Sequence, residues 1–180
     1  MKDDDECSSD ESPKKDPLAK VLWYLPIIPR LKHLFANADG AKDLTWHIDG
    51  RNCKGMLHHP TDSSQWKKIN SMYPEFGKEI RNHRLGHSND GVNPYDSLST
   101  RHSSWHVLLV IYNLPPWLCM KRKYMMLSIM ISGLRQPRND IDVYLSPLIE
   151  DLTKLWDEGI VVFDEYRNET FKLHAMLFCM

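Results

Sequence analysis

Residues 84–95 have the sequence RLGHSNDGVNPY, and this stretch decides how the fold is interpreted. It begins as a short extended segment, reaches the acidic residue Asp90, and continues with Gly91 and then with Asn93-Pro94. Asp-Gly is common turn chemistry, because Gly tolerates positive φ and Asp bonds its own backbone. The other interpretation is that Asp90 is a metal-binding carboxylate held at a strand end. Spacing alone favours the turn, and the choice between the two roles of Asp90 depends on the other segments of the chain.

The second half of the chain alternates between strand and helix patterns. Residues 83–90, 104–115 and 124–133 are short runs, the last two strongly apolar, that predict three strands. Residues 140–159 have apolar side chains at helical spacing and end at Gly159, although Pro147 can divide the helix. Residues 160–178 contain two apolar runs around EYRNET, which predicts a β-hairpin or two strands joined by a turn.

The first half contains two segments of different character. Residues 1–17 are acidic and Ser-rich and lack apolar side chains, so we expect a disordered tail. Residues 18–80 are expected to form a helical, His-rich region, and residues 81–180 the sheet-forming core.

Two helices are expected within residues 18–80. The first follows an irregular, Pro-containing start, covers about 29–36, and has Gly40 as a stop. The second is capped by Asp62 or Ser63 and runs to about Met72.

Composition limits the class of protein. The chain has 180 residues, 42% hydrophobic and 26% charged, which is typical of a globular domain. A net charge of −1 gives no bulk attraction to nucleic acid, and the basic run KRK at 121–123 is most simply a solvated loop. Four scattered cysteines predict no disulfide framework. No segment has the pattern of a signal peptide or a membrane span.

Three strands, a helix and a further strand predict an α+β fold with a partial RNase H-like mixed sheet, preceded by a small helical region. In that fold the first strand carries a carboxylate, the fourth strand pairs next to it and supplies a second, and a later helix supplies a third. Two Mg²⁺ ions held by such carboxylates activate a water or 3′-OH and stabilise the leaving oxygen of a phosphodiester. Asp90 has the position of the first carboxylate.

Long motifs in order along the chain resemble one family. They are VLWYLPIIPRLKHLFA, WHIDGR, LHHPTDSSQWKKIN, RLGHSNDGVNPY, YNLPPW, DIDVYLSPLIEDLTKLWDEG and FKLHAML, and they extend from about Pro17 to Phe178. They resemble the CACTA (En/Spm-type) DNA transposases of plants. The resemblance implies cut-and-paste DNA transposition in the nucleus, with DNA at the transposon ends as partner and Mg²⁺ as cofactor. It also implies that Asp90 is the first catalytic, metal-binding carboxylate.

The sequence also departs from that family. The strand containing LHA continues in the family to a second acidic residue, whereas this chain reads LHAMLFCM and stops at Met180. We therefore expect a truncated fragment that binds no Mg²⁺ tightly and is catalytically inactive. The alternatives are a non-enzymatic protein that interacts with DNA or with full-length transposase, and an active enzyme whose remaining residues lie in a continuation. We also expect the cut sheet to leave apolar strand residues such as Val107, Leu109, Ile111, Met126 and Ile129 without part of their helical cover.

Other residues are weaker candidates. His47, Cys53, His58 and His59 are potential Zn²⁺ ligands, but their spacing matches no zinc module and ordinary histidines are favoured. Asp140 and Asp142 are expected to stabilise a helix N-terminus. Asp164 and Glu165 are expected in a turn.

Aromatic residues and a thiol complete the candidates. Trp105 and Trp117 are expected in core packing rather than base stacking. Cys119 with His102 or His106 is discounted as a nucleophilic dyad, because nothing orders the pair.

Overall fold

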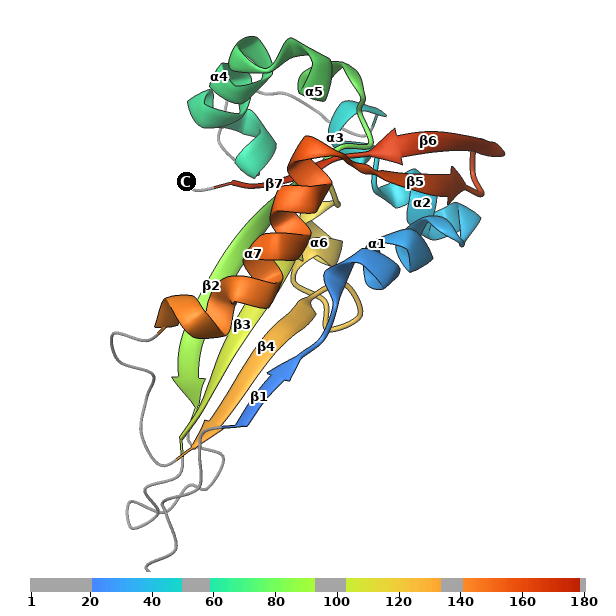
Figure 1. The fold of residues 1–180 in the computed structure, drawn as a ribbon. Helices are drawn as coiled ribbons and strands as arrows, with labels where there is room; N and C mark the ends of the chain where they lie inside the picture. Colours follow the sequence, from blue (N-terminus) through green and yellow to red (C-terminus); the bar gives the residue numbers. More distant parts are fainter. Residues whose placement is uncertain (1–20, 50–58, 93–102, 134–140, 179–180) are drawn as a thin grey trace, which may run out of the picture.

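The computed structural model describes residues 21–49, 59–92, 103–133 and 141–178 (Figure 1). The elements in chain order are β1 (Val21–Tyr24), α1 (Ile27–Phe35), α2 (Ala38–Asp43), α3 (Trp46–Asp49), the 3₁₀ helix η1 (Pro60–Asp62), α4 (Ser64–Met72), α5 (Pro74–Lys78), β2 (His83–Val92), β3 (Ser103–Ile111), α6 (Pro116–Cys119), β4 (Met126–Gly133), α7 (Ile141–Asp157), β5 (Ile160–Asp164), β6 (Glu169–Leu173) and β7 (Ala175–Leu177).

Five strands form one mixed sheet in the order β1-β4-β3-β2-β7. The strands β2, β3 and β4 form an antiparallel meander, β1 pairs antiparallel with β4, and β7 pairs parallel with β2. The strands β5 and β6 form a separate antiparallel hairpin. The predicted α+β class is therefore confirmed.

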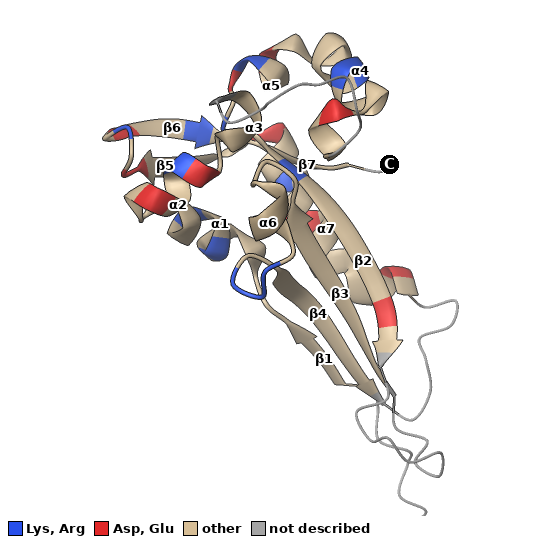
Figure 2. Ribbon diagram, turned by 180° about the vertical axis from the view of Figure 1, so that it is seen from behind, with Lys and Arg blue, Asp and Glu red and all other residues tan. Residues whose placement is uncertain are grey.

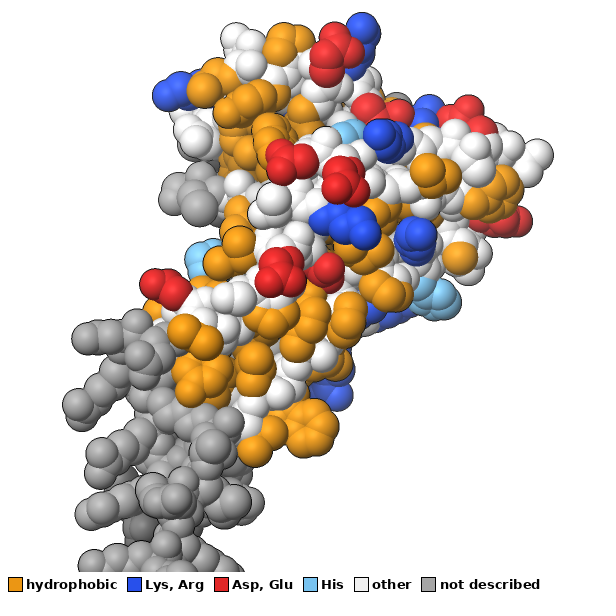
Figure 3. Space-filling model, in the orientation of Figure 1, with side chains coloured by type: hydrophobic (Ala, Val, Ile, Leu, Met, Phe, Trp, Pro, Cys, Tyr) orange, Lys and Arg blue, Asp and Glu red, His pale blue; other side chains and the backbone are white. Residues whose placement is uncertain are grey.

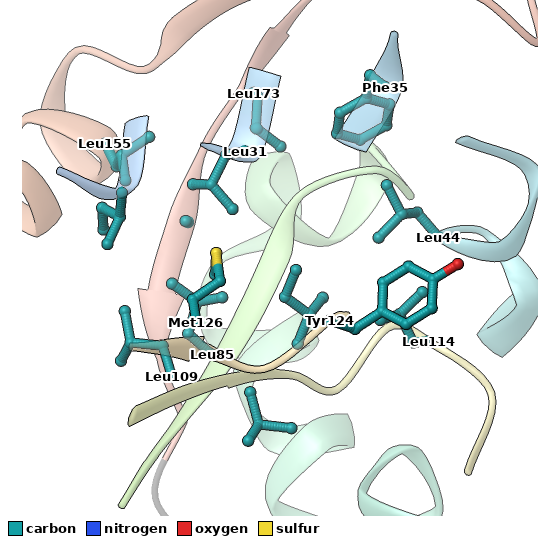
Figure 4. Packing of buried hydrophobic residues seen from close by; sticks show 14 of the residues in the cluster. Leu31, Phe35, Leu44, Leu85, Leu109, Leu114, Tyr124, Met126, Leu155 and Leu173 are labelled. Atoms are coloured by element: carbon teal, nitrogen blue, oxygen red, sulfur yellow. The ribbon is translucent and has the colours of Figure 1, made fainter. Parts of the chain in front are cut away.

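One face of the sheet is covered and carries the main core. Apolar side chains of α1 and α7 pack there against β3 and β4 and are fully or nearly fully buried (Figure 4). The inward residues of α7, Leu148 and Leu155, are seven positions apart, which is the spacing of one helical stripe. The helices α4 and α5 form a second cluster in which Trp66, Ile69 and Phe76 pack with Phe178.

The strand residues expected to lack cover are in fact among the best buried. Val107, Leu109, Ile111, Met126 and Ile129 have at most 4% of their surface exposed. The expectation was wrong because α1 and α7 together cover this face, and α1 comes from the N-terminal region whose contribution to the sheet was not foreseen.

The other face of the sheet is open over much of its area. Tyr24 donates a hydrogen bond to Asp151 of α7, so Tyr24 faces the covered side. Side chains alternate along a strand, so Trp23 faces the opposite side, where it is 57% exposed. We call this side the open face.

Several expected elements are confirmed. The three strands of the meander, the long helix and the hairpin are all present. Ser63 caps α4 by accepting a hydrogen bond from the backbone N–H of Trp66 at 3.2 Å. Gly159 follows α7 with φ of 66°, the left-handed conformation that ends many helices.

Other expectations need correction. The segment 21–24 is a strand, because β4 supplies a partner for its backbone, and Gly40 lies inside α2 instead of stopping a helix. Pro147 does not divide α7. Proline has no backbone N–H, so the carbonyl of Val143 receives no helical hydrogen bond from Pro147. Val143 is exposed, and water can bind this carbonyl instead. The tail 1–17 lies outside the described residues.

Candidate functional site

Asp90 lies near the end of β2 on the open face. It is opposite His106 in the antiparallel ladder, His106 is opposite Met130, and Met130 is opposite Trp23. Directly opposed residues project to the same side of a sheet, so these four side chains form one row across four strands. The row lies on the side away from α7, because Trp23 does.

The local structure at Asp90 differs from the expected strand end. Strand β2 continues through Gly91 to Val92, so Asp90 is a strand residue and not the first residue of a turn. Its side chain is exposed, and Oδ1 accepts a hydrogen bond from the backbone N–H of Gly91 at 2.7 Å. Asn93 and Pro94 lie outside the described residues.

The described residues do not bring further carboxylates to Asp90. Among them no group of three His, Cys, Asp or Glu side chains has the geometry of a metal site. The acidic side chains of α7 belong to the opposite side of the sheet, including Asp142 in its first turn and Asp151 at Tyr24. Asp140 lies outside the described residues. Asp90 as a catalytic metal ligand therefore stays a prediction.

Asp164 has a structural role that the sequence did not indicate. It is the last residue of β5 and is buried, whereas a turn position was expected; Glu165 does follow in the turn. Arg81 donates to Asp164 at 3.1 Å, to Glu79 and Glu169 at 2.8 Å, and stacks on Phe171. Hydrogen bonds from Arg81 lower the pKa of Glu79 despite its partial burial. This network joins the hairpin to the start of β2.

The candidate zinc residues form ordinary core contacts where they are described. His47 is buried edge-on to Trp66, and its burial lowers its pKa to about 4. His59 caps η1, where its Nδ1 lies 3.0 Å from the Thr61 hydroxyl. Cys53 and His58 lie outside the described residues, so a zinc site that includes them is untested.

Cys119 meets a histidine that sequence reasoning did not consider. Its Sγ lies 3.7 Å from Nε2 of His59, which is sixty positions earlier in the chain. The thiol donates to the backbone carbonyl of Leu114 at 3.1 Å, and burial raises the pKa of Cys119 to about 11. A neutral, buried thiol is a poor nucleophile, which agrees with the exclusion of a Cys119 dyad.

A basic and aromatic surface lies beside the open face. The exposed residues 121–123 join α6 to β4, and Trp117 of α6 is 62% exposed, with one edge against Trp46. Figure 2 views the molecule from this side and shows the basic loop next to α6. The expectation of core packing is wrong for Trp117 but confirmed for Trp105, which packs against the main core.

Comparison with known proteins identifies a family. The sequence pattern of the transposase family tnp2 matches residues 54–180, which is more than half of the chain. A search of curated proteins found no match. None of the described helices is long and apolar enough to cross a membrane. The matched segment contains the whole meander, α7, the hairpin and β7, and on this evidence the chain belongs to the tnp2 transposase family.

Proposed function

We propose that the chain carries the first part of the catalytic core of a CACTA (En/Spm-type) cut-and-paste DNA transposase, acting in the nucleus on transposon ends. The observation that carries the proposal is the sheet topology around Asp90. Strands β4, β3 and β2 form a meander, and β7 follows α7 and returns parallel to β2. This order supports an RNase H-like sheet, to which β1 and the β5–β6 hairpin are additions.

The parallel pair β2–β7 supports a role for Asp90. The pairing runs from His83 and Ala175 to Leu85 and Leu177, and Phe178 donates its backbone N–H to Leu85 at 2.8 Å. A chain that continues in this register runs toward Asp90. By the family resemblance, the second carboxylate follows this strand, and the register would bring it beside Asp90.

The residues that the structure describes around Asp90 do not fit a pair of Mg²⁺ ions. Asp90 supplies a hard oxygen ligand, but Mg²⁺ keeps several waters and needs more than one anionic ligand when it is held tightly. The described neighbours on the row are His106, Met130 and Trp23, and none of them is a carboxylate. We therefore propose that this chain does not cleave DNA by itself.

The charge distribution supports an approach of DNA from the open face. The basic loop 121–123 and the helix α6, which carries the exposed Trp117, lie beside this face (Figure 2). Lys and Arg neutralise phosphates, and an exposed indole can stack on an unpaired base. Glu150 and Asp157 of α7, and Glu158 directly after it, are exposed. Figure 3 shows acidic side chains on this other side of the molecule, where they would repel a DNA backbone.

The experiment measures binding and cleavage of a labelled duplex that carries candidate terminal repeats. We expect binding at low salt that weakens when residues 121–123 are replaced by Ala, with a salt dependence reduced in proportion to the lost phosphate contacts. We expect no cleavage with Mg²⁺ or Mn²⁺ in the wild type or in Asp90→Ala. Absence of any low-salt binding would refute the DNA role, and metal-dependent cleavage that Asp90→Ala abolishes would refute the inactive state.

A second candidate function is non-enzymatic binding of DNA or of full-length transposase. The observation that favours it is the exposure of Trp23 and Val21 on the open face. None of the described helices covers this face beside Asp90. A protein that binds a full-length transposase through this face would pull it down without DNA. The Trp23→Ser variant is expected to lose that capture.

A further inference from the structure

A cavity of about 510 Å³ lies between α5 and the C-terminal end of α7, on the side of the molecule shown in Figure 3. Its aromatic walls are Tyr73, Phe76 and Trp156, Met72 and Pro74 complete the apolar part, and His174 adds a polar ring. Glu75 and Asp157 are the charged residues of its lining. In Figure 3 hydrophobic side chains gather here, with acidic side chains beside them.

Trp156 contacts each of the other two aromatic rings of the cavity at an angle. The Tyr73 and Trp156 centroids are 5.0 Å apart with an interplanar angle of 87°, and those of Phe76 and Trp156 are 5.4 Å apart at 44°. The planes of the two rings are inclined in each pair, so these rings do not form a flat stack. The negative face of an aromatic ring attracts an ammonium or guanidinium group, most strongly when the ring is Trp.

Three sources of negative charge lie at the same cavity. Two are the carboxylates of Glu75 and Asp157. The third is the C-terminal end of the seventeen-residue helix α7, whose last carbonyls carry partial negative charge. One of these carbonyls, that of Trp156, already lies 3.0 Å from Nδ1 of His174.

We propose that this cavity binds the side chain of a Lys or Arg residue in an exposed peptide segment of a partner protein. The long aliphatic stem of such a side chain would lie against Tyr73 and Trp156, and its charged end would meet Asp157 and Glu75. The same charges disfavour a nucleic acid backbone and an acidic peptide. The occupant is therefore a basic peptide.

The lysine side chains near the cavity do not block it for a ligand. Lys78 lies 3.6 Å from Glu75, but both side chains are more than three-quarters exposed, and such pairs contribute little. Lys154 lines a neighbouring surface groove on α7 together with Glu150, Asp157 and Glu158, so carboxylates outnumber it there. No Lys or Arg is part of the cavity lining among the described residues.

The site is independent of the proposed DNA function. It lies at α5 and α7, whereas Asp90 and the loop 121–123 belong to the open face and its margin. A transposase with both surfaces could hold DNA on one side and a basic protein segment on the other. Loss of peptide binding would leave DNA binding intact, so the two proposals fail separately.

The test is an NMR titration of the whole chain with a short Gly-Ser peptide that contains one central Lys. The reporter is the indole N–H signal of Trp156, assigned by its loss in Trp156→Phe. Matched peptides carry Arg, acetyl-lysine or norleucine at the central position. We expect saturable shifts with Lys and Arg, and at least about tenfold weaker binding of the two neutral side chains.

Variants of exposed residues keep the test clear of folding effects. Glu75→Gln with Asp157→Asn is expected to weaken Lys-peptide binding at least about fivefold, and Tyr73→Ala by a similar factor. The matched control is Glu150→Gln with Glu158→Gln, which removes two exposed carboxylates of the groove and leaves the cavity unchanged. Equal binding of the Lys and acetyl-lysine peptides, an unmoved Trp156 signal, or an equal loss in the control variant would each overturn the proposal.

Discussion

Acidification should destabilise this protein at a mild pH, and His83 is the residue best suited to show it. The His83 ring is completely buried and stacks on Phe35, with centroids 5.4 Å apart and planes inclined by 16°. Neither nitrogen of the His83 ring has a well-formed hydrogen bond to the described residues. The backbone of Arg81 favours the protonated ring, but this effect on the pKa is smaller than that of burial. Burial, helped by the positive charge of Arg84 and by that of His47 once it is protonated, lowers the pKa of His83 to about 3.

The direction of the effect follows from proton binding. In the unfolded chain a histidine has a pKa near 6.5 and takes up a proton as pH falls below that value, whereas buried His83 stays neutral. Protons therefore favour the unfolded state. The stability due to a neutral His83 is fully present above about pH 6.5 and is lost progressively as pH falls toward its folded pKa of about 3.

The slope for each such histidine is half of about 1.4 kcal/mol per pH unit at pH 6.5 and approaches the full value below it, which gives about 1.7 kcal/mol between pH 6.5 and 5. His47, whose pKa is lowered to about 4 by burial and by Arg84, contributes a similar amount. Together they should lower the free energy of unfolding by about 3 kcal/mol, a large part of the 5–15 kcal/mol typical of a domain. Carboxylates such as Glu79, whose pKa is lowered, act only at more acidic pH.

The assay is urea denaturation, followed by tryptophan fluorescence, at pH 7.5, 6.5 and 5. The variant His83→Leu removes one titrating ring without breaking a well-formed hydrogen bond, so its stability at pH 7.5 should be within about 1.5 kcal/mol of wild type. Its loss between pH 6.5 and 5 should be about half that of wild type. The exposed His87→Leu is the control and should follow the wild-type profile. A wild-type stability that does not change between pH 7.5 and 5, or an unchanged slope in His83→Leu, would refute the reasoning.

Three further predictions concern packing and association. Arg81→Met leaves the buried carboxylate of Asp164 without its cation and should destabilise by about 3–5 kcal/mol, with partial recovery when Asp164→Asn is added in a double-mutant cycle read by urea denaturation. Gly86→Ala would place a methyl group 2.3 Å from the Tyr112 ring and should cost about 1–3 kcal/mol, seen as a lower Tm; an unchanged Tm would show that the ring moves freely. Trp23→Ser should lower self-association in light scattering, because Trp23 is 57% exposed on the open face, and a monodisperse wild type would contradict this.

The elements that sequence predicts well are those with local signals. Helix α4 has a Ser63 cap and an inward Trp66–Ile69 pair, and α7 has a long stripe and a Gly159 stop. Two of the meander strands, β3 and β4, are apolar runs. Their existence, order and approximate bounds could all be derived from the chain.

The elements that were missed depend on partners far away in the sequence. The strand β1 exists because β4 lies beside it, about a hundred positions later. The contact between Cys119 and His59 arises where α6 meets η1, which no spacing rule indicates. The burial of Asp164 required knowledge of Arg81, and the exposure of Trp117 required knowledge of which side of the sheet α6 covers.

The face of the sheet on which Asp90 lies is likewise not predictable from the sequence. Sequence resemblance selects Asp90 as a candidate ligand, but it does not say which face of the sheet presents it. The ladder from Asp90 through His106 to Trp23 answers that question and separates Asp90 from every carboxylate on the inward side of α7. A carboxylate that shared a metal ion with Asp90 would therefore have to reach the open face.

The contribution of α1 to the core has a consequence for how copies of this gene can change without losing the protein. Ile27, Leu31 and Phe35 are completely buried, yet they precede residue 54, where the family match begins. The segment that matches the family is thus smaller than the part of the chain that builds the main core. A deletion or splice that starts the chain at residue 54 would keep the family signature but remove five buried core residues, Ile27, Leu31, Phe35, Ala41 and Leu44, of which the large side chains are each worth about 2–5 kcal/mol. We therefore expect copies that still encode a folded protein to retain residues 21–44 together with the matched segment.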